Sequence, residues 1–426
     1  MLQVKVIRKN TDAVKAGLKK RGYDNQAILS VDEVIKLDDI RKSTQTSLDA
    51  KLSEIKKYSD SIGELFKSGK PQEANEMKTK VADLKTSAGP LENDLKSAIE
   101  GIKEILFRLP NTPDSKVPEG LSEDDNVVIK EWDAPLPTLI DNALPHWDLA
   151  TKHNIIDFKL GVKITGAGFP LFRGKGARLQ RALINFFLDE ARDAGYEEIL
   201  PPHLVNEASG IGTGSLPDKE GQMYHMEKDN LYLIPTGEIP VTNIVRDVIL
   251  KESDFPIKFC AYTPCFRREA GSYGSDVKGL NRVHQFDKVE IVQVEHPDKS
   301  HETLDQMVKY VEGILNKLEL PYRILRLCAG DLTFASALTY DFEVYSAAQE
   351  KWLEVSSVSN FETFQTNRMK CRYKDDNGKT QLAHTLNGSA LALARIVAAL
   401  LENNQVVDGI KIPEVLRSYT GFDMID

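Results

Sequence analysis

Apolar residues recur at alternating steps of three and four through two stretches in the first quarter of the chain. Such a rhythm predicts helices with a heptad seam. The first stretch carries Leu48, Leu52, Ile55, Ser59, Ile62 and Phe66, and the second carries Met77, Val81, Leu84, Ala88, Leu91, Leu95, Ala98, Ile102 and Ile105. Turn-forming residues, Ser68-Gly69-Lys70-Pro71, separate the two stretches. The pattern therefore predicts an antiparallel coiled coil.

The narrow apolar seams predict that the coiled coil projects as an arm. Two helices packed on a main domain would instead each show a wide apolar stripe. The first limb of the arm, Val31 to Phe66, would be roughly 50 Å long at about 1.5 Å per residue. Residues 30–106 hold thirteen Lys or Arg and fifteen Asp or Glu, so the arm is not a basic rod. Pro90 lies inside the second limb and removes a backbone donor, which predicts a kink or local break near Thr86 to Gly89.

Two segments flank the predicted arm. Residues 1–29 carry seven Lys or Arg against two Asp, so they form either a phosphate-contacting face or a solvated one. Residues 110–126 are rich in Pro, Ser and acidic side chains, which is typical of a linker. The expected organisation is therefore a helical domain over 1–109, a linker over 110–126 and a second domain over 127–426.

Strand-like and helix-like segments mix in the second domain without a regular βαβ alternation. This mixture predicts an antiparallel sheet flanked by helices, and hence an α+β fold for the whole chain. Val127–Trp132 is expected as a strand and Arg178–Gly195 as an amphipathic helix. Two further strands, Tyr340–Ser346 and Trp352–Val358, are expected to form a hairpin around residues 347–350.

Composition limits the classes of function. The chain has 426 residues and a formal net charge of −9, so it is not a basic nucleic-acid binder by composition. Its four cysteines form no C-x-x-C pair, which is typical of reduced core thiols in the cytoplasm. No apolar region of signal-peptide type follows the N-terminus. The most apolar segment, Ala390–Leu401, is interrupted by Arg395 and too short for a bilayer, so no membrane association is expected.

The most informative stretch runs from Phe259 to Gln293 and reads as a strand, a Gly- and Ser-rich loop and a returning strand. Side chains two apart share a face of a strand, so Arg267 and Glu269 are expected to project together. On the returning strand Arg282, His284, Phe286 and Glu290 would share one face, and Val283, Val289 and Ile291 the other. Arginine suits phosphate and an aromatic ring can stack on a base. A hairpin with a solvated charged face is the alternative.

This stretch, with the wording FRREAGSYG…RVHQFDKVE, resembles motif 2 of class II aminoacyl-tRNA synthetases, and the seryl-tRNA synthetase family in particular. The similarity extends from MLQVKVIRKNTDAVKAGLKKRGYD to LRSYTGFDMID. It implies a class II catalytic domain and an arm that reaches serine tRNA, with contacts from lysines near the tip. Those lysines are Lys56, Lys57, Lys67, Lys70, Lys78 and Lys80. The substrates would be L-serine, ATP with Mg²⁺, serine tRNA and, where present, selenocysteine tRNA. A motif-1-like segment ending at Pro202 implies a homodimer.

The resemblance also assigns site residues. The expected serine-binding residues are Thr236, Gly237, Glu238, Arg267, Glu290, Asn387 and Ser389. The expected ATP-binding residues are Arg267, Arg268, Glu269, Arg282, Val283, Phe286, Glu354, Val355, Ser356, Ser357 and Arg395. Arg267 and Arg395 would act catalytically through charge stabilisation, and Glu354 and Ser357 would hold Mg²⁺.

Two of these assignments carry a structural condition. Glu354 and Ser357 are three apart, so a regular strand would send them to opposite faces unless a bulge or a strand end intervenes. Arg395 is a lone charge in an apolar helix, and a structural ion pair is the alternative to a triphosphate contact.

The implied reaction needs no protein nucleophile, since serine attacks the α-phosphate of ATP and the adenylate then passes its acyl group to tRNA. No H-x-G-H or K-M-S-K-S pattern occurs, which argues against the other synthetase class. Two alternatives remain at this stage. Relatives that load a carrier protein lack the arm, and a non-catalytic RNA-binding descendant would have lost phosphate-binding arginines or serine-pocket carboxylates.

Overall fold

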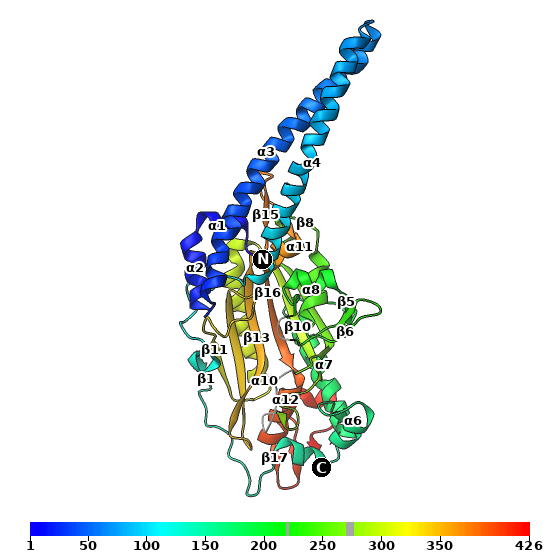
Figure 1. The fold of residues 1–426 in the computed structure, drawn as a ribbon. Helices are drawn as coiled ribbons and strands as arrows, with labels where there is room; N and C mark the ends of the chain where they lie inside the picture. The colour runs from blue at the N-terminus through cyan, green and yellow to red at the C-terminus, as the bar shows by residue number, and fades with distance from the viewer. Residues whose placement is uncertain (219–220, 270–276) are drawn as a thin grey trace. The chain divides into compact units, whose positions relative to one another are not determined.

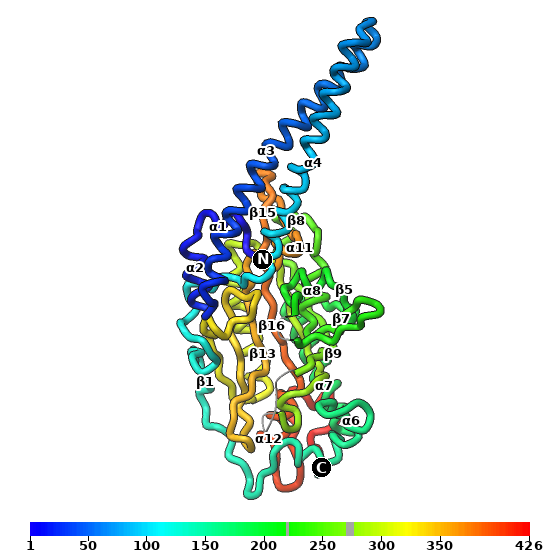
Figure 2. The backbone as a smooth tube through the Cα atoms, viewed as in Figure 1, coloured from blue at the N-terminus to red at the C-terminus, as the bar shows by residue number. Residues whose placement is uncertain are grey.

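The computed structural model describes residues 1–218, 221–269 and 277–426. The chain divides into two compact units, Leu2–Pro110 and Asn111–Asp426, with Met1 belonging to the second (Figures 1 and 2). Within the described ranges, no helix is long and apolar enough to cross a membrane.

Four helices build the first unit, and the two long ones run side by side (Figure 1). They are α1 (Val4–Lys9), α2 (Thr11–Lys20), α3 (Asn25–Lys67) and α4 (Pro71–Arg108). Asp24 caps α3 by accepting a hydrogen bond from the backbone N–H of Ala27 at 2.8 Å. Gly69 has a φ of +73° in the turn between the long helices, and Pro71 occupies the first turn of α4. The predicted antiparallel helical pair is confirmed.

The seam between α3 and α4 is narrow, as its spacing predicted. Val31, Val34 and Leu48 are buried on α3, and α4 buries a column of mostly small side chains. That column is Ala74, Val81, Ala88, Ala98, Ile102 and Leu106. Leu52 and Phe66 remain 44% and 43% exposed, because a two-helix layer has no third element to cover them. The cation of Lys78 lies over the Phe66 ring, 4.7 Å from its centroid.

Of the kink or local break predicted near Thr86 to Gly89, the break is wrong, because α4 continues through Pro90. Proline deprives the helix of one backbone donor, but the flanking turns keep their own bonds. Ala88 is packed in the seam, and the hydroxyls of Thr86 and Ser87 bond the carbonyls of Ala82 and Leu84 at 3.0 Å each. Packing along the seam therefore outweighs the loss of a single hydrogen bond.

Part of the basic N-terminal segment is neutralised within its own unit. Arg8 contacts Asp38 at 3.1 Å and Asp39 at 2.7 Å, and Lys15 contacts Asp32 at 2.7 Å. The Asp38 carboxylate is 3% exposed and also contacts Arg41 and Lys42. Burial opposes its charge, but the bonds from Lys42 and Arg41 outweigh burial and lower the pKa of Asp38.

Replacing Asp38 with alanine should lower the free energy of unfolding of the helical unit by about 2 kcal/mol, because three cations lose a shared buried acceptor. Urea denaturation followed by circular dichroism would measure the loss. Because the pKa of Asp38 is lowered by folding, the difference from the parent should be largest near neutral pH and shrink in acid. The matched control is Asp39→Ala, whose carboxylate is 58% exposed and should cost under about 0.5 kcal/mol. Equal losses for the two variants would contradict the central role of Asp38.

An eight-stranded sheet forms the centre of the second unit (Figure 1). Its strand order is β1 (Val127–Glu131), β11 (Tyr322–Arg326), β12 (Leu338–Ser346), β13 (Lys351–Glu362), β16 (His384–Ala392), β10 (Gln285–Glu295), β9 (Ile257–Phe266) and β4 (Glu197–Glu198). Every neighbouring pair is antiparallel except β4 with β9. The predicted antiparallel sheet is confirmed, including the strand at Val127 and the hairpin around residues 347–350.

Three amphipathic helices pack on this sheet: α7 (Gly174–Asp193), α10 (Ser300–Lys317) and α12 (Leu393–Asn403). Their apolar faces, with Phe186, Val311 and Ile396 among them, share one core with the strand residues. The predicted helix at 178–195 is confirmed, although it begins at Gly174. Short helices complete the unit: α5 (His146–Lys152), α6 (Phe158–Ile164), α8 (Glu207–Thr213), α9 (Glu238–Thr242), α11 (Thr363–Met369) and α13 (Glu414–Thr420).

Smaller sheets join these peripheral segments. One contains β5 (Leu204–Asn206), β7 (Leu231–Leu233) and β6 (His225–Met226), and another contains β15 (Thr380–Leu382), β14 (Arg372–Lys374) and β8 (Ile249–Lys251). Two more contain β17 (Gln405–Val406), β18 (Gly409–Lys411) and β19 (Met424–Ile425), and the pair β2 (Ile156–Asp157) and β3 (Leu171–Phe172).

The segment expected as a linker begins with a residue packed into the second unit. Asn111 is buried, and its amide donates to the carbonyls of Ala335 at 3.0 Å and Phe361 at 2.9 Å. The four cysteines are free and buried, as their spacing predicted.

Candidate active site

The centre of the large sheet brings two of the expected serine-binding residues together. Glu290 on β10 lies directly opposite Ser389 on β16, and Asn387 lies opposite Val292. Paired residues on neighbouring antiparallel strands have side chains on the same face, only about 5 Å apart at Cβ. Glu290, Ser389 and Asn387 are all at least nine-tenths buried. These strands therefore supply a sheltered polar surface.

The Thr236-Gly237-Glu238 turn lies against this surface and opens helix α9. Thr236 donates its hydroxyl proton to the Glu290 carboxylate at 3.0 Å and accepts from the Glu238 backbone N–H at 3.2 Å. A Cβ added to Gly237 would lie 3.1 Å from Thr263 Oγ1 and 3.3 Å from Glu290 Cβ. Glycine at this position therefore allows the turn to approach the sheet closely.

Lys288 belongs to the same network, although no motif in the sequence singled it out. Its Nζ lies 2.5 Å from Glu290 Oε2 and donates to the Thr236 hydroxyl at 2.8 Å. The two charged side chains are 6% and 2% exposed. The strand alternation that places Phe286 and Glu290 on one face also places Lys288 there, so the sequence could have predicted that Lys288 lies at the site. A buried cation beside Glu290 fixes that carboxylate as an acceptor.

Glu238 is a half-buried carboxyl group whose charge is disfavoured by its surroundings. Burial is the main cause and repulsion from Glu290 adds to it, so the pKa of Glu238 rises to about 7 despite bonds from Gln365 and Asn387. The Gln365 amide donates to Glu238 Oε1 at 2.6 Å and accepts from the Thr385 hydroxyl at 2.7 Å. Gln365 carries no recognisable pattern in the sequence, because β13 and α11 place it there through tertiary packing.

The raised pKa of Glu238 predicts a pH dependence for the binding of an ammonium ligand. Below about pH 7 the carboxyl group is largely neutral, so an ammonium group must displace its proton. If serine binds here through its ammonium group, the KM for serine should rise roughly tenfold between pH 8 and pH 6. Pyrophosphate exchange at saturating ATP would measure this rise, with the KM for ATP as the control. A KM for serine that stays constant over this range would contradict the assignment.

The expectation that Arg267 and Glu269 project together from the first strand is wrong. Strand β9 ends at Phe266, where its ladder with Gln285 also ends, and Glu269 has a φ of +47°. Arg282 and His284 likewise precede β10 rather than lie on it. The segment between the limbs includes residues 270–276, which lie outside the described ranges.

Contacts nevertheless bring these side chains together. The Arg267 guanidinium lies 5.2 Å from the Phe286 ring centroid, and its Nε donates to the Pro235 carbonyl at 3.3 Å. Arg282 pairs with Glu269 at 3.3 Å. A planar cation beside an aromatic ring suits a phosphate next to a base, as in a nucleotide.

The β-bulge that Glu354 and Ser357 need in order to share a face is present in β13. Ser356 pairs with Phe342 but Glu354 pairs with Glu343, so Val355 is the extra residue on β13. This bulge places Glu354 and Ser357 on one face together with Asp341, which lies opposite Ser357. Burial, and next the charge of Glu354, raise the pKa of Asp341 well above its usual range, while a bond from Ser357 opposes the rise.

These oxygen donors match the preference of Mg²⁺ for carboxylate and other oxygen ligands. Asp341 could have been found from the hairpin register around residues 347–350. The half-buried Asp341 carboxylate has one buried oxygen, Oδ1, for which the described residues offer no hydrogen-bond partner. A site with an unsatisfied buried acceptor beside a second carboxylate fits a cation.

Arg395 projects from α12 toward the same bulge. Its Nε donates to the Asn281 carbonyl at 2.9 Å, and its Nη1 donates to the Glu354 carbonyl at 2.7 Å and approaches Glu354 Oε2 at 3.4 Å. The ion-pair alternative for Arg395 thus has a partner in the structure, but Glu354 is half-exposed and the contact is long. Both side chains could re-pair with a bound nucleotide.

The remaining expected ATP residues fall into two groups. Val283, Val355 and Ser356 are buried, and the Ser356 hydroxyl donates to the Ser389 carbonyl at 2.5 Å, so their side chains are engaged inside the protein. Arg268 lies 5.7 Å from the Tyr224 ring, and its backbone N–H donates to the Gln222 carbonyl at 2.9 Å.

Comparisons with known proteins agree with this architecture. Residues 223–404 match the tRNA synthetase class II core domain (G, H, P, S and T), and residues 1–113 match the seryl-tRNA synthetase N-terminal domain. Serine–tRNA ligases of Salinibacter ruber and Akkermansia muciniphila are 48% and 45% identical to this chain, each over 100% of it and 99% of the relative. The crystal structure of seryl-tRNA synthetase from Pyrococcus horikoshii complexed with ATP has a TM-score of 0.92 at 34% identity, covering 100% of this chain and 99% of that one.

An antiparallel sheet with this polar centre and a matching core domain defines a class II aminoacyl-tRNA synthetase fold. The match of the N-terminal helical unit and the sequence identity over the full length of the chain identify the family within this class. The chain belongs to the seryl-tRNA synthetase family.

Proposed function

We propose that this chain attaches L-serine to serine tRNA through a seryl-adenylate intermediate. The observation that carries the proposal is the buried polar network in which Glu238 lies beside the Glu290–Lys288–Thr236 cluster. A carboxylate suits the ammonium group that every α-amino acid carries, and a second acceptor suits the hydroxyl that distinguishes serine from alanine and glycine. The ligase relatives and the ATP-complexed relative support the same reading.

In the first step an oxygen of the serine carboxylate attacks the α-phosphorus of ATP, and pyrophosphate leaves. Glu238 holds the ammonium group of serine. Glu290 accepts a hydrogen bond from the serine hydroxyl, and Ser389 contacts the same hydroxyl. Arg267 neutralises charge at the α-phosphate, and Phe286 stacks on adenine. Arg282 and Arg395 contact the outer phosphates, and these contacts align and stabilise the reacting groups.

Glu354 and Ser357, with Asp341 beside them, would hold Mg²⁺, which supplies positive charge to the ATP phosphates. Forming the nucleotide complex would require Arg395 to exchange its Glu354 contact for phosphate oxygens.

In the second step a ribose hydroxyl of the terminal adenosine of tRNA attacks the serine carbonyl carbon, and AMP leaves. The helical pair α3–α4 would bind the tRNA, with local lysines and shape rather than net charge providing the contacts. Selenocysteine tRNA is included as a second acceptor. Homodimerisation through the segment ending at Pro202 and a cytoplasmic location complete the proposal.

ATP–pyrophosphate exchange, assayed separately with each amino acid, tests the first step. Exchange should depend on serine, and alanine and glycine should support it at least a hundredfold less efficiently. Charging of serine tRNA with labelled serine tests the second step. A chain that binds tRNA but catalyses no exchange with any amino acid would be a non-catalytic RNA-binding protein.

A further inference from the structure

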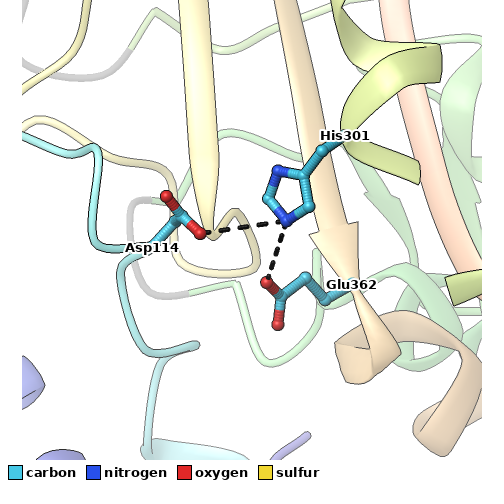
Figure 3. A group of neighbouring side chains, drawn as sticks. All are labelled: Asp114, His301 and Glu362. Carbon is cyan, nitrogen blue, oxygen red and sulfur yellow. Dashed lines mark ion pairs between the residues drawn. The ribbon is translucent and has the colours of Figure 1, made fainter. Parts of the chain in front are cut away.

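Three side chains from distant parts of the sequence converge in the second unit (Figure 3). Asp114 lies in the segment that precedes β1, His301 is the second residue of α10, and Glu362 is the last residue of β13. His301 Nε2 lies 3.8 Å from Asp114 Oδ2 and 3.9 Å from Glu362 Oε1. The three potential ligand atoms all lie within 4.8 Å of one another.

These separations are too long for direct hydrogen bonds and only slightly longer than the spacing of ligands around one metal ion. Ligand atoms bound at about 2.1 Å from a first-row ion lie roughly 3.0–3.5 Å apart. Side-chain movements of under about 1 Å would therefore close the set around a cation.

The scaffold already fixes each member of the cluster. Asp114 Oδ1 accepts from the Lys116 backbone N–H at 2.8 Å, and its Oδ2 faces His301 (Figure 3). The Asn360 side chain accepts from the Glu362 backbone N–H at 2.8 Å and donates to the Ser300 hydroxyl at 3.1 Å. One buried amide therefore ties the backbone around Glu362 to the start of the helix that carries His301.

The cluster holds more acidic than basic groups, which favours the binding of a cation. Two carboxyl groups face one imidazole, so with both of them ionised the cluster carries net negative charge whether the imidazole is neutral or protonated. Burial raises the pKa of Glu362, and Asp114 adds to the rise while His301 opposes it. Glu362 also has a φ of +48° and a ψ of −132°, an unusual conformation for a residue with a side chain. The protein thus maintains a strained backbone that directs a carboxylate at a histidine.

We propose that Asp114, His301 and Glu362 bind one divalent first-row transition-metal ion, with Zn²⁺ or Mn²⁺ as the suitable probes. An imidazole with two carboxylates favours such ions over Mg²⁺ or Ca²⁺, which prefer oxygen ligands alone. His301 and Glu362 are 39% and 35% exposed, so water can complete the coordination. The site is separate from the Mg²⁺ ligands proposed above, since Glu362 follows Glu354 by eight residues, roughly 25 Å along a strand. The ion would cross-link three segments and stabilise the unit.

Isothermal titration of the full chain, freed of metal and without nucleotide, with ZnCl₂ and separately with MnCl₂ tests the site. At least one of the two metals should bind at one ion per chain with a dissociation constant below about 100 µM and raise the Tm. His301→Gln and Asp114→Asn should each weaken binding at least about tenfold. The matched control is His225→Gln, which changes an exposed histidine outside the cluster and should leave binding unchanged.

Two variants at different elements keep the test decisive if one of them fails to fold, which circular dichroism would show. Absence of binding by both metals would mean that the cluster is an ion pair only. Binding that survives His301→Gln and Asp114→Asn would place the metal elsewhere, and either result overturns the proposal. Serine-dependent exchange is measured independently, so failure of this site leaves the proposed function intact.

Discussion

Replacing Glu290 with alanine should reduce kcat/KM for serine in pyrophosphate exchange by at least about a thousandfold, while ATP binding stays within about twofold. Glu290 is 1% exposed and bonded to Lys288 and Thr236. Its removal leaves a buried lysine without its carboxylate and removes the acceptor proposed for the serine hydroxyl. ATP affinity, measured by equilibrium dialysis, should persist because Phe286 and Arg267 remain in place.

Two controls separate recognition from folding. Gln285→Ala changes an exposed residue on the same strand and should leave exchange unchanged. Glu290→Gln loses the charge but keeps the shape of the side chain and an oxygen that can accept from Lys288 and Thr236, so circular dichroism should show a folded chain that has still lost most serine activation. If Glu290→Ala activates serine as well as the parent does, the assignment of Glu290 is wrong.

Removing the arm should lower serine tRNA charging by orders of magnitude while serine-dependent exchange stays within about tenfold. The residues assigned to ATP and serine all lie after Asn111, and the helical unit Leu2–Pro110 contributes none of them. Deletion of residues 49–97, closed by a short Gly-Ser linker, keeps the buried contacts of α1 and α2 with the lower part of α3. The loss should be greatest at low tRNA concentration.

Salt provides an internal check on the same experiment. If the arm binds the RNA backbone, raised salt should weaken the intact enzyme toward the truncated one. Replacing Lys56, Lys57, Lys67 and Lys80 with glutamine should give an intermediate loss with the fold intact. Unchanged charging by the truncated chain would show that the arm is not the tRNA-binding element. Lost exchange in a folded truncation would show that the arm helps to build the active site.

Sequence reasoning predicted the elements better than their ends. The heptad steps gave the helical pair, and alternation gave β9 and β10, because both periodicities reflect burial along one element. Alternation could not show that β9 ends at Phe266, since that depends on where Gln285 leaves the ladder. Pro90 led to the wrong prediction of a break, although the heptad steps through Ala88 and Leu91 already indicated that the seam continues past it.

The sequence predicted those residues of the candidate site that belong to recognisable motifs. It did not predict the residues that only tertiary packing brings to the site. Recognisable sequence motifs contain Thr236, Glu238, Glu290 and Ser389. Gln365 belongs to none of them, because it reaches Glu238 only through the positions of α9 and α11. The bulge at Val355 lies between these cases. The sequence showed that a bulge was required if Glu354 and Ser357 are to act together, and the register showed where it lies.

The hydrogen-bond chain from Thr385 through Gln365 to Glu238 has a consequence for where a proton resides. Because the Thr385 hydroxyl donates to the carbonyl oxygen of Gln365, the amide must present its N–H group to Glu238 Oε1. A protonated Glu238 therefore carries its hydrogen on Oε2, and this second oxygen is the one from which the proton departs when a cationic ligand arrives. A glutamine far from any motif thus decides which side of the carboxyl group exchanges its proton.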